Sequence, residues 1–160
     1  MPPHRNVLKL PRERRQSERA VTYWARKAVE FKSRPTLTQL DPGETIDDHD
    51  WSHRFVIAPD RLAEVSSLLM CGANLARLLE LPDGPLKYTL MFRHVPQRFL
   101  ELFTKGCAGA TSSGSPVRIA GAIQQKDGRR ELYRTVFIPV GVNLVFGAFT
   151  SIVKDPRADL

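Results

Sequence analysis

Apolar residues dominate the last quarter of the chain. Residues 137–153 read FIPVGVNLVFGAFTSIV, a run without a single charge. A membrane helix needs about 20 apolar residues, but Pro139 and the turn formers Gly141 and Asn143 interrupt this run near its start. Strand-favouring Val, Ile, Phe and Thr stand on both sides of the interruption. The run therefore predicts the end of one strand, a tight turn and a largely buried last strand.

Other strands are predicted upstream. VRIAGAIQQ and RELYRTVFIPV flank the sequence KDGR, and Asp127-Gly128 between two β-rich runs is a strong hairpin signal. WSHRFVIAP alternates weakly and turns at Pro59-Asp60, and residues 63–70 form a further β-rich run. The pattern thus predicts five strands, the last three of them antiparallel neighbours.

Helical periodicity marks the remaining segments. In AVTYWARKAVEFKSRP an apolar stripe recurs at helical spacing, and Pro35 ends the helix; the stripe comprises Val21, Trp24, Ala28 and Phe31. A second helix is predicted over ANLARLLEL, and a third from about Pro96 into the small residues GCAGATSSGSP, which mark its end. The order of elements predicts an α+β fold, with a five-stranded antiparallel sheet, helices on one face and an N-terminal flanking helix.

The leading stripe is too apolar for solvent, and so short a helix is marginal alone. It must dock on its own sheet or on a second copy of itself. We expect the second arrangement, a homodimer whose isologous contact centres on Trp24 and Phe31.

Charge separates an arm from a body. The chain has 160 residues and a net charge of +7, and residues 1–34 carry ten Lys and Arg against three Glu. We expect a basic flexible arm over residues 1–19, a single domain over 20–155 and a tail over 156–160. The neutral body argues against a fold with a wholly basic nucleic-acid face. The N-terminus lacks the apolar core of an export signal, which favours a cytoplasmic location.

Two segments contain residues that bind metals in other proteins. DDHDWSH, residues 47–53, interleaves Asp with His49 and His53, but it bridges a turn-rich connection and a strand, where this spacing does not bring ligands together. Cys71 and Cys107 have no metal or disulfide spacing and are expected to be reduced thiols. We therefore expect no metal.

Short motifs along most of the chain carry a resemblance to a known family, beginning with Tyr23-Trp24, Arg34-Pro35 and Asp41-Pro42. These residues resemble the opening "YW…lP…diDP" of the PAS superfamily, and more narrowly of a stand-alone PAS-like family of alphaproteobacteria. Residues 68–81 stand where the family has "G…ELFG", although this chain has CGANLARLLEL there, which alters the rim of any pocket. The hairpin at Asp127-Gly128 and the closing strand with Gly147-Ala148 match the family's end.

The resemblance implies a sensory or regulatory role, through a ligand, a redox state or protein contacts, and it supplies no catalytic residues. Some PAS proteins hold haem through a His before the final strands, but His94 lies so close to Pro96 that it is expected to be a helix-entry residue. Cys71-Gly72-Ala73-Asn74 lacks the context of the flavin-reactive Cys of photosensor domains. No cofactor is therefore expected.

A cavity between sheet and helices is the natural place for a ligand in such a fold. Its candidate lining combines aromatic and aliphatic residues with three arginines that would hold a carboxylate. The candidates are Met70, Leu75, Phe92, Arg93, Phe99, Phe103, Arg118, Arg134, Phe137, Phe146 and Phe149. The alternative for the apolar members is plain core, and for the arginines a solvated outer face.

The preferred function is a stand-alone PAS-like regulatory module without an output domain, which binds a small molecule or a signalling protein and is not an enzyme. One alternative is a small α+β enzyme of the ketosteroid-isomerase kind, which would need an ionisable base deep in its cavity. Another is an adaptor whose basic arm contacts nucleic acid or an anionic membrane.

Overall fold

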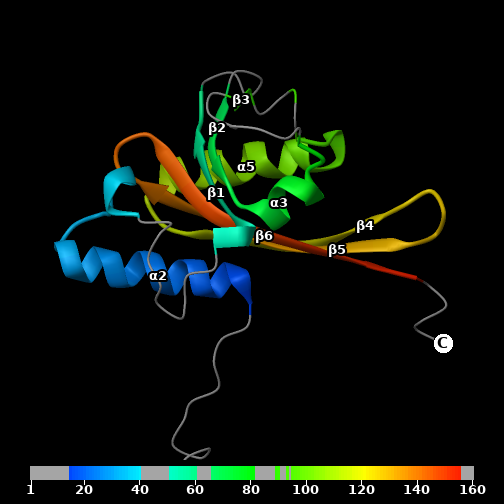
Figure 1. The fold of residues 1–160 in the computed structure, drawn as a ribbon, viewed down its shortest axis with the longest axis horizontal. Coiled ribbons are helices and arrows are strands. Elements are labelled where there is room, and N and C mark those ends of the chain that lie inside the picture. Colours follow the sequence, from blue (N-terminus) through cyan, green and yellow to red (C-terminus); the bar gives the residue numbers. More distant parts are fainter. Residues whose placement is uncertain are drawn as a thin grey trace, which may run out of the picture.

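An antiparallel sheet forms the centre of the molecule (Figure 1). The computed structural model describes residues 15–40, 51–60, 66–81, 89–90, 93 and 95–155. In this part of the chain the six strands lie in the order β3-β2-β1-β6-β5-β4. Their bounds are β1 Arg54–Ala58, β2 Ser67–Cys71, β3 Thr89–Leu90, β4 Val117–Gln124, β5 Arg130–Val140 and β6 Leu144–Lys154.

The predicted α+β fold and its five strands are confirmed, and β3, of two residues, is an addition at one edge. The uncharged run 137–153 contains the end of β5, a turn with Gly141 at a φ of 56°, and nearly all of β6. Pro139 is tolerated in β5 because β4 pairs only as far as Phe137 and leaves the end of β5 without a neighbour on that side. None of the described helices is long and apolar enough to span a membrane.

Helices cover both faces of the sheet. Helix α3, Ala73–Leu78, and helix α5, Gln97–Ser113, lie on one face, and helix α2, Gln16–Phe31, lies on the other (Figure 1). Two short 3-10 turns, Leu37–Gln39 and Trp51–His53, connect these elements to the sheet. Between the sheet and these helices the side chains form two buried clusters, one on each face of the sheet.

Helix α5 corrects one prediction. The small residues of GCAGATSSGSP were expected to end this helix, but α5 continues through them to Ser113 and ends at Gly114, whose φ is 69°. The small residues are packing positions, because Gly106, Cys107 and Ala110 are buried. A Cβ on Gly106 would overlap ring atoms of Phe137, so glycine is what lets the helix lie this close to β5.

Helix α2 also differs from its prediction at two points. It begins at Gln16, so residues 16–19 of the expected arm are helical. Its buried residues are Ser17, Ala20, Tyr23 and Lys27, which form a stripe beside the predicted one. The small side chains of Ser17 and Ala20 allow close approach to the sheet, and the aliphatic stem of Lys27 is buried in the way long side chains allow.

Candidate functional site

Aromatic rings fill the space between the sheet and α5. Five of the predicted lining residues belong to one cluster there and are at most 1% exposed: Leu75, Phe99, Phe103, Phe137 and Phe149. The ring centroids of Phe103 and Phe137 are 5.5 Å apart, and those of Phe99 and Phe149 are 4.9 Å apart. Phe55, which was not among the candidates, lies 5.4 Å from Phe103 and closes the group. These distances are those of packed aromatic pairs.

The other candidates lie elsewhere. Met70 and Phe146 pack in the cluster on the α2 face, so the structure separates them from the five residues above. Arg93 is exposed, and Phe92 lies outside the described residues. Arg118 and Arg134 are exposed on the outer strands, on the α2 face of the sheet. The predicted lining is thus divided between the two faces.

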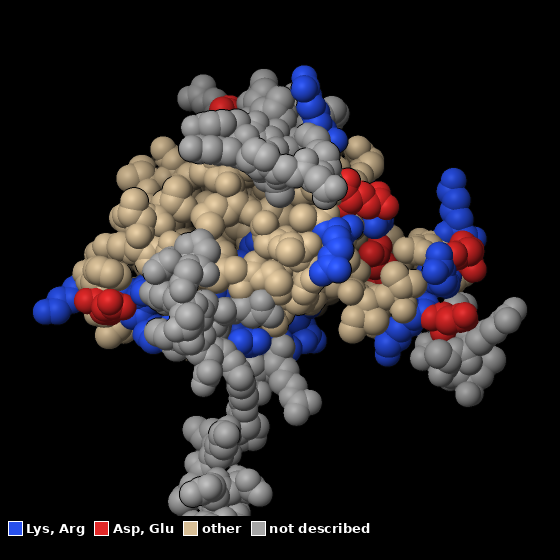
Figure 2. Space-filling view, in the orientation of Figure 1, with Lys and Arg blue, Asp and Glu red and all other residues tan. Residues whose placement is uncertain are grey.

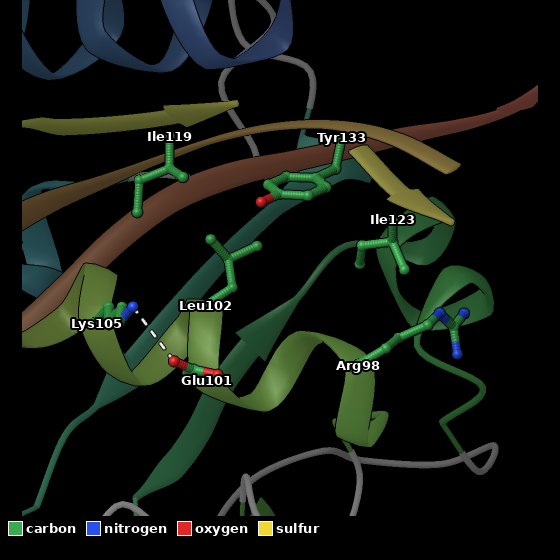
Figure 3. Close-up of a pocket in the computed structure, with 7 residues that line it drawn as sticks. All are labelled: Arg98, Glu101, Leu102, Lys105, Ile119, Ile123 and Tyr133. Atoms are coloured by element: carbon green, nitrogen blue, oxygen red, sulfur yellow. Dashed lines mark ion pairs between the residues drawn. The ribbon is translucent and has the colours of Figure 1, made fainter. Parts of the chain in front are cut away.

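An open cavity of about 300 Å³ lies between α5 and the outer strands β4 and β5 (Figure 3). Leu102 from α5, Ile119 and Ile123 from β4, and Tyr133 from β5 line it, with Arg98, Glu101 and Lys105 along its α5 side. None of these residues was among the predicted pocket residues. The strand itself was predictable, and along its whole length half-buried residues alternate with exposed ones. Only the strand register, however, shows which of its apolar residues face α5.

The polar side chains near this cavity are paired. Arg98 Nε donates to Glu131 Oε1 at 2.9 Å, and the Ser151 hydroxyl donates to Glu131 Oε2 at 2.8 Å. Glu101 and Lys105 form an ion pair at 3.2 Å across one turn of α5. The ring of Tyr133 stacks nearly parallel to that of Phe149, with an interplanar angle of 7°. The floor of the cavity therefore consists of stacked aromatic rings, and the charged side chains along its rim are paired with groups of opposite charge.

A shallower recess of about 170 Å³ lies on the opposite face, at the start of α2. Arg15, Arg118 and Arg134 contribute three cations to it. Glu18 contributes one carboxylate. Arg118 Nε donates to its two oxygens, at 2.8 Å to Oε2 and 3.2 Å to Oε1. Lys and Arg side chains gather along this lower side of the molecule in Figure 2. Arg118 therefore binds a carboxylate of the chain itself.

The four residues expected at a dimer interface are used mainly within the chain. Val21 and Trp24 pack on the α2-face cluster, and Trp24 Nε1 donates to the carbonyl oxygen of Pro139 at 3.0 Å. Ala28 is half-buried, and Phe31 is 40% exposed. A dimer centred on Trp24 stays a prediction, and it would require the helix to give up this contact.

A buried arginine lies under α2. Arg54 is fully buried, and its guanidinium carbon lies 5.0 Å from the ring of Tyr23, 5.6 Å from that of Trp51 and 5.9 Å from that of Phe146. Such distances give cation–π attraction, which strengthens away from water. No pattern in the sequence points to these contacts of Arg54, because the three rings come from α2, a 3-10 turn and β6.

Most of the segment 47–53 considered for metal binding, including His49, lies outside the described residues, as does His94. His53 Nδ1 lies 3.1 Å from the Ser52 hydroxyl. No group of three metal-ligating side chains occurs in the described part of the chain. Cys71 and Cys107 are free thiols there, and burial raises the pKa of each to about 12. Residues 1–14 of the arm predicted over residues 1–19 also lie outside this part.

No protein-family model matches the sequence, and no curated protein matches it. Among solved structures, a variant of the fungal photoreceptor VVD matches with a TM-score of 0.43 and 10% identity, over 81% of this chain and 92% of that one. The PAS domain of an HTR-like protein from Haloarcula marismortui matches with a TM-score of 0.36 and 9% identity, over 82% of this chain and 99% of that one. TM-scores this low carry no conclusion about this chain, so its α+β class rests on its own sheet and helices.

Proposed function

We propose that this chain is a PAS-like regulatory module that works through contacts with other proteins and does not catalyse a reaction. The observation that carries the proposal is the aromatic packing between the sheet and α5. In this packing five of the eleven residues first considered for a ligand pocket fill the space with one another, which favours the surface of the chain as the place where it binds other molecules. The motifs that resemble the PAS superfamily agree with such a role.

A small-molecule ligand is the second candidate, because of the cavity beside Tyr133. Its volume of about 300 Å³ is at the lower limit for ligand pockets. It is lined by apolar side chains from two strands and a helix, which is typical of such sites. A ligand there would be bound at the surface, at one side of the sheet, rather than in the core.

An enzyme of the ketosteroid-isomerase kind has less support. Its base would have to face an open interior. Among the described residues Glu131 is the buried carboxylate, and both of its oxygens are engaged, by Arg98 and Ser151.

Native mass spectrometry of the purified full chain, together with its mass after denaturation, tests the proposal. We expect no small molecule at one equivalent per chain. A stoichiometric small molecule released on denaturation would overturn the protein-contact function and favour the second candidate. Absorbance between the near ultraviolet and the red provides an independent check for a coloured cofactor.

A further inference from the structure

We propose that β4 is an interface for a second copy of this chain. The two copies join their β4 strands antiparallel, about a two-fold axis that passes midway between their two Gly121 residues, and the two sheets become one. This inference rests on the proposed function, since it names one of the protein contacts through which the module would work.

The first argument is that the outer edge of β4 is long and unpaired among the described residues. Strand β4 is the terminal strand of the sheet, is eight residues long and pairs with β5 along its whole length. At about 3.4 Å per residue it presents roughly 27 Å of backbone. No described strand pairs with its outer side. Edges are usually protected by Lys, Pro or a bulge, but β4 reads VRIAGAIQ, has no proline and pairs with β5 without a shift in register.

The second argument is charge. Arg118 is the one charged residue of β4, and it is held by Glu18 on the α2 face. The end of the hairpin formed by β4 and β5 extends beyond α2 and α3, so that neither helix covers it (Figure 1). The edge is therefore long, regular and nearly uncharged, which are the properties that permit strand addition.

The third argument is self-complementarity. A two-fold axis normal to the sheet keeps every residue on its own face, so opposed residues must share a face. With Gly121 on the axis, Ile119 lies opposite Ile123 of the second copy, and Ala120 lies opposite Ala122. Arg118 lies opposite Gln124, whose amide oxygen can accept from it. Apolar residues thus meet apolar residues, and no like charges are opposed.

Neighbouring registers are poorer. An axis through Ala120 would set Ile119 against Gly121 of the second copy, where it has no side chain to contact. An axis through Ala122 would set Arg118 against Lys126, which places like charges opposite each other. The sequence of β4 and its turn therefore selects the register centred on Gly121.

The cavity beside Tyr133 extends this interface. Ile119 and Ile123 line the cavity and are also the apolar residues that would meet across the axis. A Cβ on Gly121 would lie 2.7 Å from the Tyr133 hydroxyl oxygen, so the phenol ring reaches out over the strand at the position of the axis. Each copy would then place an isoleucine next to the cavity of the other. Aromatic residues at the centre of a contact commonly dominate its affinity.

The test is sedimentation velocity of the full chain over a concentration series. We expect the wild type to dimerise and Ala122→Lys to weaken the dimer by about tenfold or more, because its ammonium lies diagonal to Arg118 of the second copy. The matched control is Ile152→Lys, which places the same charge on an apolar residue of β6 that is 63% exposed and away from the edge. It should dimerise like the wild type. Circular dichroism shows that both variants fold.

A disulfide experiment tests the register. Residues 120 and 122 are opposed only between copies, with Cα atoms about 4.5–5.5 Å apart, within the range of a disulfide. A mixture of Ala120→Cys and Ala122→Cys chains should cross-link on oxidation, whereas each variant alone should not, like the wild type with its two native thiols. Cross-linking in either variant alone would refute this register.

A monomeric wild type at high micromolar concentration overturns the proposal, as does an Ala122→Lys chain that dimerises as well as the wild type. Neither result touches the proposed function, which fails only if a stoichiometric small molecule accompanies the chain. The two ideas can therefore fail separately.

Discussion

Two glycines in one helix give a direct test of how α5 packs. Gly106 and Gly109 both lie inside α5, and replacing either by alanine raises helix propensity by about 1 kcal/mol. Their surroundings differ. A Cβ on Gly106 would overlap Cγ, Cδ2 and Cε2 of Phe137, whereas a Cβ on Gly109 would meet Val117 Cγ2 at 3.3 Å.

The overlap at Gly106 is not relieved cheaply. It includes Cγ, the ring atom nearest the backbone, so rotation of the ring does not remove it. Phe137 is fully buried, and its ring centroid lies 5.6 Å from that of Phe55 and 5.5 Å from that of Phe103. Overpacking costs about 1–3 kcal/mol, and the overlap with three ring atoms places this site at about 2–3 kcal/mol, which exceeds the gain in propensity. At Gly109 the contact is with a methyl group of the half-buried Val117, whose side chain can shift by a few tenths of an ångström.

We therefore expect Gly106→Ala to lower the free energy of unfolding by about 1–2 kcal/mol net. Gly109→Ala should leave it unchanged or raise it by up to about 1 kcal/mol. Urea unfolding followed by circular dichroism measures both, and the corresponding shift in Tm is about 3 °C per kcal/mol for a chain of this size. Equal stability of the two variants would refute the close approach of α5 to β5.

Three further predictions concern other parts of the molecule. Trp24→Phe removes the hydrogen bond to Pro139 and should cost about 1 kcal/mol in urea unfolding; an unchanged midpoint would mean that α2 does not dock through this contact. Burial raises the pKa of both cysteines from 9.0 to about 12, so iodoacetamide should react slowly at pH 8 until the chain unfolds. Because the unfolded thiols ionise first, their contribution to stability is full below pH 9.0 and is lost as pH rises toward about 12; fast alkylation of the folded chain would contradict this. Deleting residues 1–14 should leave the Tm unchanged. Deleting residues 1–19 also removes the first turn of α2 and the Glu18–Arg118 ion pair, and this deletion should lower the Tm by a few degrees. Equal Tm values for the two shortened chains would mean that this turn is dispensable.

Local signals explain what the sequence could predict. The Asp127-Gly128 hairpin and the break at Gly141 depend on turn chemistry within a few residues, and both are where the pattern places them. The helical stripe of Trp24 and the apolar run of β6 likewise need only periodicity. Local rules of this kind fix the elements and their order.

The remainder depends on distances between elements. Small residues in GCAGATSS look like a helix end, and only the nearness of Phe137 explains why they are helical packing positions. The burial of Arg54 requires three rings from separate elements. The cavity beside Tyr133 requires the register between β4 and β5, in which Gly121 lies opposite Tyr133. No short window of sequence contains such information.

The uneven covering of the sheet connects these observations to function. Over the central strands β1 and β6 and the end of β5, α2 is anchored by Trp24 and by the rings around Arg54, and α5 packs through the phenylalanine cluster. Toward the β4 edge the same sheet has only half-buried isoleucines, Tyr133 and a shallow cavity on its α5 side. Ile152 is 63% exposed near the end of β6. Because the helices leave little free surface over the centre of the sheet, a protein contact of the chain is expected at its β4 edge.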